Sequence, residues 1–330
     1  MCFQVFKDEF MGYGRTFGMR IKLFYNVKGL TRMILPKGWY RSRLTAILND
    51  SQFRQDVELQ LRVAYYNKLN EVGYSVPETK SLCDFSLKGK ASAYFFDTYE
   101  YSRYFPDHLK AHFLFGDITY VPPNPSIVKS RPIGQGNEAS ILLNLDKYRH
   151  FNFISDRIPF SKKMAALVWR GHVSSLKPER LQFLEKYYEH PLCDVGNTNQ
   201  WAPQPEWQKP FMSIKDQLRY KYILCLEGVD VATNLKWVMS SNSVAVMPRP
   251  RYETWFMEGT LRPGCHYVEI KDDFSDLEAK LRYYNQHPKE AETIIANAHA
   301  YVKQFQNSAR ERYVSLKVLE KYFLMTGQVI

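Results

Sequence analysis

The stretch that decides the fold is residues 165–180, with the sequence AALVWRGHVSSLKPER. Its apolar beginning is short enough for one buried β-strand, and Arg170 follows where a parallel strand would end. Ser174 and the serine after it are candidate helix caps, and Pro178 suits a first helical turn. The stretch therefore predicts a strand, a basic loop and a helix N-terminus, where open α/β sheets bind ligands and phosphate is favoured. An ordinary strand–helix turn with a surface arginine would give the same local pattern.

The sequence after this stretch continues to alternate between predicted strands and helices. Short apolar runs predict buried strands, and helical spacing of apolar residues predicts the helices between them. Ser275 and Glu278 have the form of a capping box, which predicts a helix start. Strands are predicted at residues 222–226, 243–247 and 266–270, and helices at 232–240, from 275 up to Pro288, through 294–302, and at about 310–325. This alternation indicates a parallel sheet with helices on both faces.

The N-terminal half has a less regular pattern. Residues 50–71 are predicted as one helix, whose apolar face includes Val57 and Leu61. Prolines at positions 122, 123 and 125 exclude regular structure around them. Other candidate elements are strands at residues 93–96 and 112–115, and a basic, aromatic domain hinge at 149–153.

Composition sets broad limits on the class of protein. The 330 residues allow one large or two medium domains, and a hydrophobic content of 45% is enough for a packed core. No apolar run reaches the roughly 18 residues that a membrane span needs. The N-terminal segment does not have the apolar core and cleavage site of a signal peptide, so we expect a cytosolic protein. The five cysteines are scattered without metal-site spacing and are expected to be reduced.

The net charge of +11 predicts an anionic partner, such as nucleic acid, acidic lipid or a phosphorylated substrate. The interval between Glu9 and Asp50 contains no other acidic residue, and its cations alternate with aromatic and aliphatic residues. Such a mixture favours the surface of an anionic membrane. Nucleic-acid binding and an ordinary solvated basic face are the alternatives. The cations of this interval are Arg15, Arg20, Lys22, Lys28, Arg32, Lys37, Arg41 and Arg43.

A motif search narrows the possible chemistry. The sequence contains no G-x-G-x-x-G fingerprint, no P-loop and no G-x-S-x-G elbow. It also contains no Asp-x-Asp, the short motif that commonly holds a divalent ion on a nucleotide-sugar diphosphate. An enzyme of this sequence that used a nucleotide sugar would need cations and helix N-termini to neutralise the diphosphate. Arg170, Arg180 and Lys236 lie near predicted loop–helix junctions and are candidates for that task.

An ordered set of motifs resembles glycosyltransferase family 90, whose members include bacterial lipopolysaccharide glycosyltransferases and Rumi-type protein O-glucosyltransferases. The resemblance covers roughly residues 80–305 and is nearest to the bacterial members. Its motifs are Tyr101–Pro106, Phe115-Gly116-Asp117, Ile127–Ile133, Val168–Gly171 with Ser174–Arg180, Tyr220–Gly228, Asp230–Trp237, and Leu261–Val268 with Asp273, Ser275 and Leu277.

The resemblance implies an α/β fold of GT-B type, with two Rossmann-like domains and a cleft between them. It predicts an acceptor-side domain at residues 1–155 and a donor-nucleotide domain at residues 156–305. Residues 306–330 are expected to form a helix that packs back on the N-terminal domain. The resemblance also implies a UDP-sugar donor, inversion at the sugar carbon, and transfer without a metal or other cofactor.

Site residues follow from the same resemblance. Asp117 matches the family's general base, although a turn-forming aspartate before prolines would look alike. Arg170 matches an arginine placed by the donor phosphates, and Asn234 stands where eukaryotic members have an arginine. The predicted donor-binding residues are Arg170, Gly171, Ser174, Arg180, Gly228, Asn234, Lys236 and Glu253, and the predicted acceptor-binding residues are Lys129 and Arg131.

The sequence thus predicts a hexosyltransferase that moves a hexose from a UDP-sugar to a hydroxyl of a lipopolysaccharide core or related glycan. We expect it to be cytoplasmic and peripheral at the inner face of the membrane. One alternative is a protein acceptor, as in the eukaryotic members. Another is a noncatalytic nucleic-acid-binding protein, although nucleic acid is not the expected partner.

Overall fold

The computed structural model describes residues 15–76, 79–87, 92–175, 177–199 and 204–330, with backbone only for 15–22 and 92. The chain divides into two compact units. The first, here called the sheet unit, contains His150–Pro250 and Thr260–Gln304, together with residues up to Lys22. The second, here called the helical unit, contains Leu23–Arg149, Arg251–Gly259 and Phe305–Ile330. The assignment of a donor-side and an acceptor-side domain stays a prediction.

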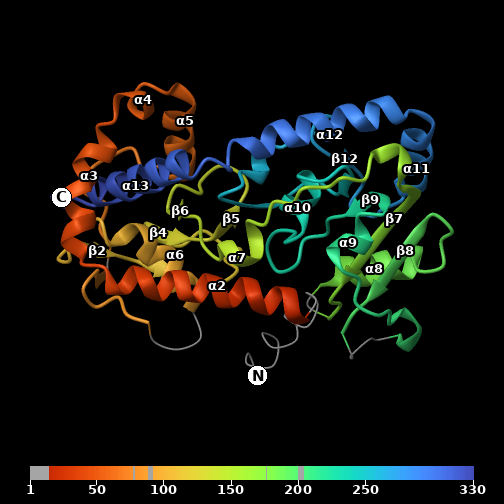
Figure 1. The fold of residues 1–330 in the computed structure, drawn as a ribbon, viewed down its shortest axis with the longest axis horizontal. Helices are drawn as coiled ribbons and strands as arrows, with labels where there is room; N and C mark the ends of the chain where they lie inside the picture. The colour runs from red at the N-terminus through yellow and green to blue at the C-terminus, as the bar shows by residue number, and fades with distance from the viewer. Residues whose placement is uncertain (1–14, 77–78, 88–91, 176, 200–203) are drawn as a thin grey trace. The chain divides into compact units, whose positions relative to one another are not determined.

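The sheet unit is built on a five-stranded parallel sheet with the strand order β12-β10-β9-β7-β8 (Figure 1). Its strands are β7 (Met164–Gly171), β8 (Cys193–Asn197), β9 (Tyr220–Leu224), β10 (Val244–Met247) and β12 (Val268–Glu269). Its helices are α8 (Pro178–Tyr187), α9 (Ile214–Gln217), α10 (Leu235–Met239), α11 (Leu277–Gln286) and α12 (Pro288–Lys303), with short 3₁₀ turns at Phe160–Lys162 and Pro205–Trp207. The predicted alternation of strand and helix is confirmed here.

One core joins the sheet to three of these helices. Leu167, Tyr222 and Val246 project from neighbouring strands into a cluster that also includes Phe183 of α8 and Leu281 of α11. The central strands are nearly continuous apolar runs, as expected for a parallel sheet. Because their carboxyl ends meet at one edge, the loops after β7, β9, β10 and β12 are brought together there.

The helical unit contains helices around short strands. Its helices are α3 (Lys37–Leu48), α4 (Ser51–Arg54), α5 (Val57–Tyr66), α6 (Ser92–Ser102), α7 (Lys147–His150) and α13 (Ser308–Met325), with a 3₁₀ turn at Glu258–Thr260; α2 (Arg15–Ile34) enters it at Leu23. Strands β3 (Phe113–Leu114), β4 (Ser126–Val128) and β6 (Ser140–Leu142) form a parallel sheet; β5 (Ser130–Pro132) pairs with β11 (Tyr252–Thr254), and β1 (Lys80–Ser81) with β2 (Lys110–Ala111), both antiparallel.

The last helix packs on α5 within this unit. Arg62 Nη1 donates to Glu311 Oε1 at 2.6 Å, and both side chains are largely buried. Asn67 Nδ2 donates to the Val318 carbonyl at 3.1 Å, which fixes the end of α5 against α13. The C-terminal helix therefore contributes to the core of the helical unit, which also contains Asp117.

Two predictions for the N-terminal half are wrong. Residues 93–96 belong to helix α6 and not to a strand. Phe95 stacks on Tyr99 four residues later, and Tyr94, Phe95 and Phe96 are all buried. A short apolar run that is buried on several sides has no period that separates helix from strand.

The predicted helix over residues 50–71 is also wrong as a single element. Asp50 accepts from Gln52 N and caps α4, and Asp56 accepts from Leu59 N and caps α5. A second N-cap six residues after the first restarts the helix and changes its phase. Val57 and Leu61, predicted to be buried, are therefore exposed.

The predicted helix caps of the sheet unit need smaller corrections. The N-cap of α8 is Lys177 rather than either serine, and Pro178 occupies the first helical position as predicted. The backbone N–H of Lys177 donates to the Ser174 carbonyl at 2.9 Å, so the serine belongs to a turn before the helix. Helix α11 begins at Leu277, after Asp276, and not at Ser275. Among the described helices, none is long and apolar enough to cross a bilayer.

Candidate functional site

Two cations meet at the carboxyl edge of the sheet unit. Arg180 donates to the carbonyls of His172 at 2.9 Å, Glu227 at 3.1 Å and Leu226 at 3.2 Å, so it joins the loop after β7 to the loop after β9. A Cβ at Gly228 would lie 3.2 Å from Arg180 Nη2 and 3.9 Å from Lys177 Nζ. Lys177, Arg180 and the backbone of Gly228 therefore form a compact positive site, here called the cation cluster.

The loop after β7 is fixed in place by the end of β8. The backbone N–H of Val173 donates to the side-chain oxygens of Asn197 and Asn199, at 3.3 and 3.2 Å. Asn199 Nδ2 donates back to the Val173 carbonyl at 2.8 Å. Any side chain at Gly171 would collide with Trp169, since a Cβ there would lie 2.2 Å from its ring. The loop that leads to the cation cluster is therefore held before any ligand binds.

Arg170 lies elsewhere. Its Nη2 donates to Asp194 Oδ1 at 2.8 Å, and its Nη1 to the Asp194 carbonyl at 2.8 Å. Asp194 pairs in register with Val168, so the Arg170 side chain reaches back along the strand. Trp169 lies under Arg180, whose guanidinium is 5.7 Å from its ring. Because successive strand residues point to opposite faces, Arg170 and Arg180 lie on opposite faces of β7.

The Asp194 carboxylate is the centre of its own network. Besides Arg170, it accepts from Tyr220 at 2.6 Å and from Lys209 at 3.0 Å. Burial alone would raise the pKa of Asp194, but the hydrogen bonds from Tyr220, Arg170 and Lys209 outweigh it and lower the pKa to about 2. Contact of Arg170 with a donor phosphate stays a prediction.

Two further predicted donor residues flank the end of β9. Asn234 is the N-cap of α10, and its Nδ2 donates to the Leu224 carbonyl at 2.9 Å. Lys236 is fully buried in α10. Burial raises the pKa of the Cys225 thiol, and the positive charge of Lys236 partly opposes that shift. Asn234 therefore ties the start of α10 to the end of β9, and direct contact of either residue with a donor stays a prediction.

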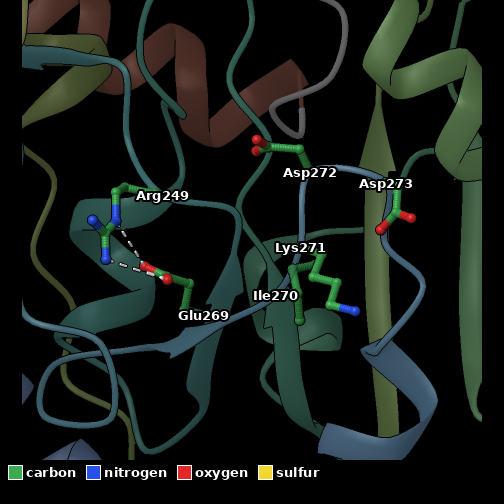
Figure 2. A pocket seen from close by; sticks show the side chains of 6 residues that line it. All are labelled: Arg249, Glu269, Ile270, Lys271, Asp272 and Asp273. Carbon is green, nitrogen blue, oxygen red and sulfur yellow. Dashed lines mark hydrogen bonds and ion pairs between the residues drawn. The ribbon is translucent and has the colours of Figure 1, made fainter.

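A pocket of about 540 Å³ opens beside the ends of β10 and β12 (Figure 2). Arg249 and Glu269 bind each other at one side of it, with Nε–Oε2 and Nη2–Oε1 distances of 3.3 and 3.4 Å. Tyr267 donates to the same glutamate at 2.8 Å. The pocket is lined by Arg249, Glu269, Ile270, Lys271, Asp272 and Asp273.

The loop that forms one side of this pocket is anchored by Phe274. This residue has a φ of 61°, in the left-handed region, and is completely buried. Its ring packs 5.2 Å from Phe183, and its carbonyl accepts from the hydroxyl of Tyr187. Hydrogen bonds from Ser275 lower the pKa of Asp273. The anchor holds the pocket's polar side chains in a defined loop.

The helical unit holds the predicted base. Asp117 follows β3 and pairs with Lys129 Nζ; the lysine side chain is buried, whereas the Asp117 side chain is 26% exposed. The neighbouring Ile118 forms two hydrogen bonds with the Ser130 hydroxyl. The Ile118 N–H donates to this hydroxyl at 3.1 Å, and the hydroxyl donates to the Ile118 carbonyl at 3.0 Å. Asp117 is therefore a positioned carboxylate that water or a substrate hydroxyl can reach.

A second carboxylate lies near the same lysine. Burial raises the pKa of Asp146 to about 6, while Arg149, 3.0 Å away, and Lys129 act in the opposite direction. Asp117 adds to the upward shift. Of these two carboxyl groups, Asp117 is the more exposed.

Arg131 and Glu253 bind each other in the core of the helical unit. They face one another across the β5–β11 pair, with Arg131 Nε 2.8 Å from Glu253 Oε1. Arg131 also donates to the carbonyls of Tyr65 at 2.7 Å and Ser140 at 3.0 Å. Both side chains are buried. The sequence predicted Glu253 to bind donor and Arg131 to bind acceptor; the structure shows their mutual ion pair, and sugar contacts stay predictions.

Comparison with known proteins identifies the family. The family described as "Glycosyl transferase family 90" matches residues 147–326 of this chain. "O-glucosyltransferase LpsA" of Dichelobacter nodosus is 44% identical over 307 residues, which is 92% of this chain and 95% of that protein. The chain belongs to glycosyltransferase family 90. The resemblance seen in the sequence is confirmed, and the chain is a glycosyltransferase.

Eukaryotic members of family 90 match a smaller part. "Protein O-glucosyltransferase 3" of Rattus norvegicus and of Homo sapiens is 29% identical over 160 residues, 47% of this chain and 31% of each of those proteins. The family match begins at residue 147, so it includes the cation cluster and the pocket but not Asp117. Within the described ranges, no group of three or more His, Cys, Asp or Glu side chains is placed to hold a metal ion. That the reaction of this chain needs no metal stays a prediction.

Sequence reasoning missed two parts of this family 90 site. The sequence does not single out Lys177, because a lysine in a loop carries no sign that it will be buried beside a glycine. The pocket had a usable signal: Lys271 to Asp273 is a charged run directly after the predicted strand at 266–270. In a parallel sheet that position faces the ligand edge.

Proposed function

We propose that this chain transfers glucose from UDP-glucose to a hydroxyl of a lipopolysaccharide core or related glycan, with inversion and without a metal. Glucose is chosen because the relatives from Dichelobacter, rat and human are all described as O-glucosyltransferases. The observation that carries the proposal is the cation cluster at the carboxyl edge of the sheet unit, next to a polar pocket. Two units that each contain a parallel sheet support a GT-B arrangement.

The pocket and the cation cluster favour one orientation of the donor along the sheet edge. The pocket follows β10 and β12, and the cation cluster follows β7 and β9, so their centres are about two strand spacings, or 10 Å, apart. Glu269, Asp272 and Asp273 accept hydrogen bonds and repel phosphate, which suits ribose hydroxyls. Lys177 and Arg180 attract the diphosphate. The nucleoside therefore occupies the pocket, and the diphosphate occupies the cation cluster. At Gly171, Ser174 and Gly228 the backbone comes close to the donor.

The chemistry then needs a base and a stabilised leaving group. Asp117 takes the proton of the acceptor hydroxyl as its oxygen attacks the sugar carbon from the side opposite the diphosphate. The bond between that carbon and the phosphate oxygen breaks, and its electrons leave with UDP. A positioned base contributes about 10²–10⁴-fold. The cation cluster stabilises the negative charge that develops on UDP, and fixed charges in such sites contribute a similar or larger factor.

Lys129 and Arg131 serve the acceptor side of this scheme. Lys129 binds the Asp117 carboxylate from its buried side and so lies next to the position of the acceptor hydroxyl. Arg131, paired with Glu253, supports the strand pair that begins at Ser130, next to Lys129. A glycan acceptor built on a lipid would place the enzyme at the inner face of the cytoplasmic membrane, as a peripheral protein. We do not propose the nucleic-acid alternative, because the chain belongs to a glycosyltransferase family.

A donor screen tests this proposal. Transfer to delipidated lipopolysaccharide core would be measured with UDP-glucose, UDP-galactose and UDP-N-acetylhexosamines, each with and without a chelator. We expect transfer from UDP-glucose in the presence of the chelator. Strict dependence on manganese or magnesium contradicts the metal-free mechanism, and transfer from another donor alone contradicts the choice of glucose. Transfer to a protein serine and not to the glycan would favour the protein acceptor of the rat and human relatives.

A further inference from the structure

One face of helix α2 exposes a continuous row of large apolar side chains. Leu23, Val27, Leu30 and Ile34 follow spacings of four, three and four residues, which places them on one side of a helix. Their exposed fractions are 66%, 49%, 49% and 80%. Phe24, at the edge of the row, is 73% exposed. A row of this size is unusual on a surface that faces only water.

The opposite face of the same helix is fixed to α6. Tyr25 donates its hydroxyl proton to the Ala93 carbonyl at 2.9 Å, and Arg32 pairs with Glu100. Gly29 lies against the ring of Phe96, where an added Cβ would come within 2.5 Å. Figure 1 shows α2 and α6 adjacent in the helical unit. Because these contacts set the rotation of the helix, the apolar row points outward as a built feature.

Helix α3 extends this surface. Trp39 is 48% exposed, and the Arg43 guanidinium lies 3.5 Å from the centre of its ring. Tyr40, Leu44 and Leu48 form the buried side of α3. Lys28 adds an exposed cation beside the row on α2. We call the exposed row of α2, together with Phe24, Lys28, Trp39 and Arg43, the apolar face.

The charge around this face has one sign. The sequence has no carboxylate between Glu9 and Asp50. Among the described residues, the carboxylates that form ion pairs with α2 and α3, Glu100 and Asp107, are each paired with two cations, and Asp97, which Tyr25 contacts, is buried and pairs with Lys147. Glu100 binds Arg32 and Lys147, and Asp107 binds Lys37 and Arg41. An apolar surface bordered by cations complements a bilayer with anionic headgroups.

We propose that the apolar face docks on an anionic lipid bilayer and holds the helical unit at the membrane surface. A second copy of the chain fits less well, because a two-fold interface through this face would bring Lys28 and Arg43 of both copies into one interface. The row is too short and too polar in its surroundings to span the bilayer, so it lies in the interface plane. Trp39 suits the headgroup level.

This position has a consequence for the candidate base. Helix α6, which α2 covers, also carries Tyr94, whose ring lies 5.2 Å from Phe115. Phe115 is two residues before Asp117. One helix layer therefore separates the apolar face from the loop of the base. The reason for docking, an acceptor built on a lipid, rests on the proposed function. Docking itself needs no donor or acceptor.

Vesicle flotation without substrates tests the docking. The double variant Phe24→Glu with Ile34→Glu places carboxylates in the row at two well-exposed positions, so the fold should tolerate it. We expect binding to phosphatidylglycerol–phosphatidylcholine vesicles to fall by about tenfold or more, since each carboxylate opposes both insertion and the anionic surface. The matched control is Val57→Glu with Leu61→Glu, at equally exposed positions on α5 of the same unit. The control should bind like the unchanged protein.

A charge variant and two further readouts complete the test. Lys28→Gln with Arg43→Gln should reduce the preference for vesicles containing phosphatidylglycerol over pure phosphatidylcholine. Transfer to a soluble, delipidated acceptor should stay unchanged in the Phe24→Glu, Ile34→Glu variant, which separates docking from catalysis. Equal vesicle binding by this variant and by its control would overturn the proposal. So would a dimer of the unchanged protein that the same variant converts to a monomer, because a second copy would then cover the face.

Discussion

The two units of this glycosyltransferase use their cations in different ways. In the sheet unit, Arg180 donates to three backbone carbonyls, which position its guanidinium beside Gly228. In the helical unit, Lys129 and Arg131 bind the carboxylates of Asp117 and Glu253. The first arrangement fixes a guanidinium between two loops, and the second holds a carboxylate in place. The difference teaches that a cation's partners, more than its place in a motif, indicate its task.

The largest expected effect lies in the helical unit. Asp117→Asn preserves the shape of the side chain and much of its hydrogen bonding but removes the proton acceptor. We expect transfer to fall by about 10²-fold or more, with UDP binding and melting temperature nearly unchanged. Glu138→Gln, at an exposed position of the same unit, is the matched control. Near-normal transfer by the Asn variant, or a comparable loss in the control, would show that the base is another carboxylate.

The next effect compares the two arginines of the fold-deciding stretch. Arg180→Ala should weaken UDP binding by about tenfold or more and uridine binding much less, because charge-assisted contacts to phosphate are lost. Arg170→Ala should change UDP binding less, since its guanidinium binds Asp194 on the other face of β7. Calorimetry with both ligands measures the difference in affinity. Arg180→Lys keeps the positive charge but removes the guanidinium contacts with the loops, so it separates these two causes of a loss. A larger loss of UDP affinity in Arg170→Ala than in Arg180→Ala would mean that Arg170 contacts the donor phosphates.

A smaller effect is expected at the pocket. Glu269→Gln keeps the size of the side chain but removes the charge that binds Arg249 and that we assign to the ribose. Uridine and UDP affinities should therefore fall together, by a few fold each. Lys271→Gln, which changes a charge of the same pocket without removing a carboxylate, is the control. A loss confined to UDP would mean that the phosphates, and not the nucleoside, occupy the pocket.

The smallest effect is on acid stability. The pKa of Asp194 is lowered from 3.8 to about 2 in the folded chain, so its contribution to stability is present above pH 3.8 and is lost as the pH falls toward 2. Asp194→Asn should lower stability at neutral pH and flatten its pH dependence across this window. Chemical denaturation at several pH values measures the slope, with Asp84→Asn as an exposed control. An unchanged slope in the Asp194 variant would mean that its ion pairs do not stabilise the fold.

The accuracy of the sequence analysis also differs between the units. Strands β7, β9 and β10 are buried apolar runs ended by glycine, proline or polar residues, so the pattern alone located them. In the helical unit, β3 has two residues and β4 has three, which is too short for a period to be read. The run at 93–96 became a helix because its neighbours bury several of its sides, which a sequence pattern does not show.

The candidate site was predictable in type but not in geometry. Asp117, Arg180 and Gly228 follow predicted strands or begin predicted helices, which is where the ligand edge of a parallel sheet was expected. The partners of Arg170 and Glu253 could not be foreseen. Asp194 lies 24 residues from Arg170, and Arg131 lies 122 residues from Glu253. Such pairs depend on strand order and register, which no local pattern encodes.

One titration tests the central claim that the sheet unit binds the donor through its diphosphate. UDP and uridine would be titrated separately into the unchanged protein by calorimetry, in buffer that contains a metal chelator. The cation cluster predicts that UDP binds about tenfold tighter than uridine or more, and that the difference narrows as salt rises. Equal affinities for the two ligands, or UDP binding that returns only when a divalent metal is added, would contradict the account.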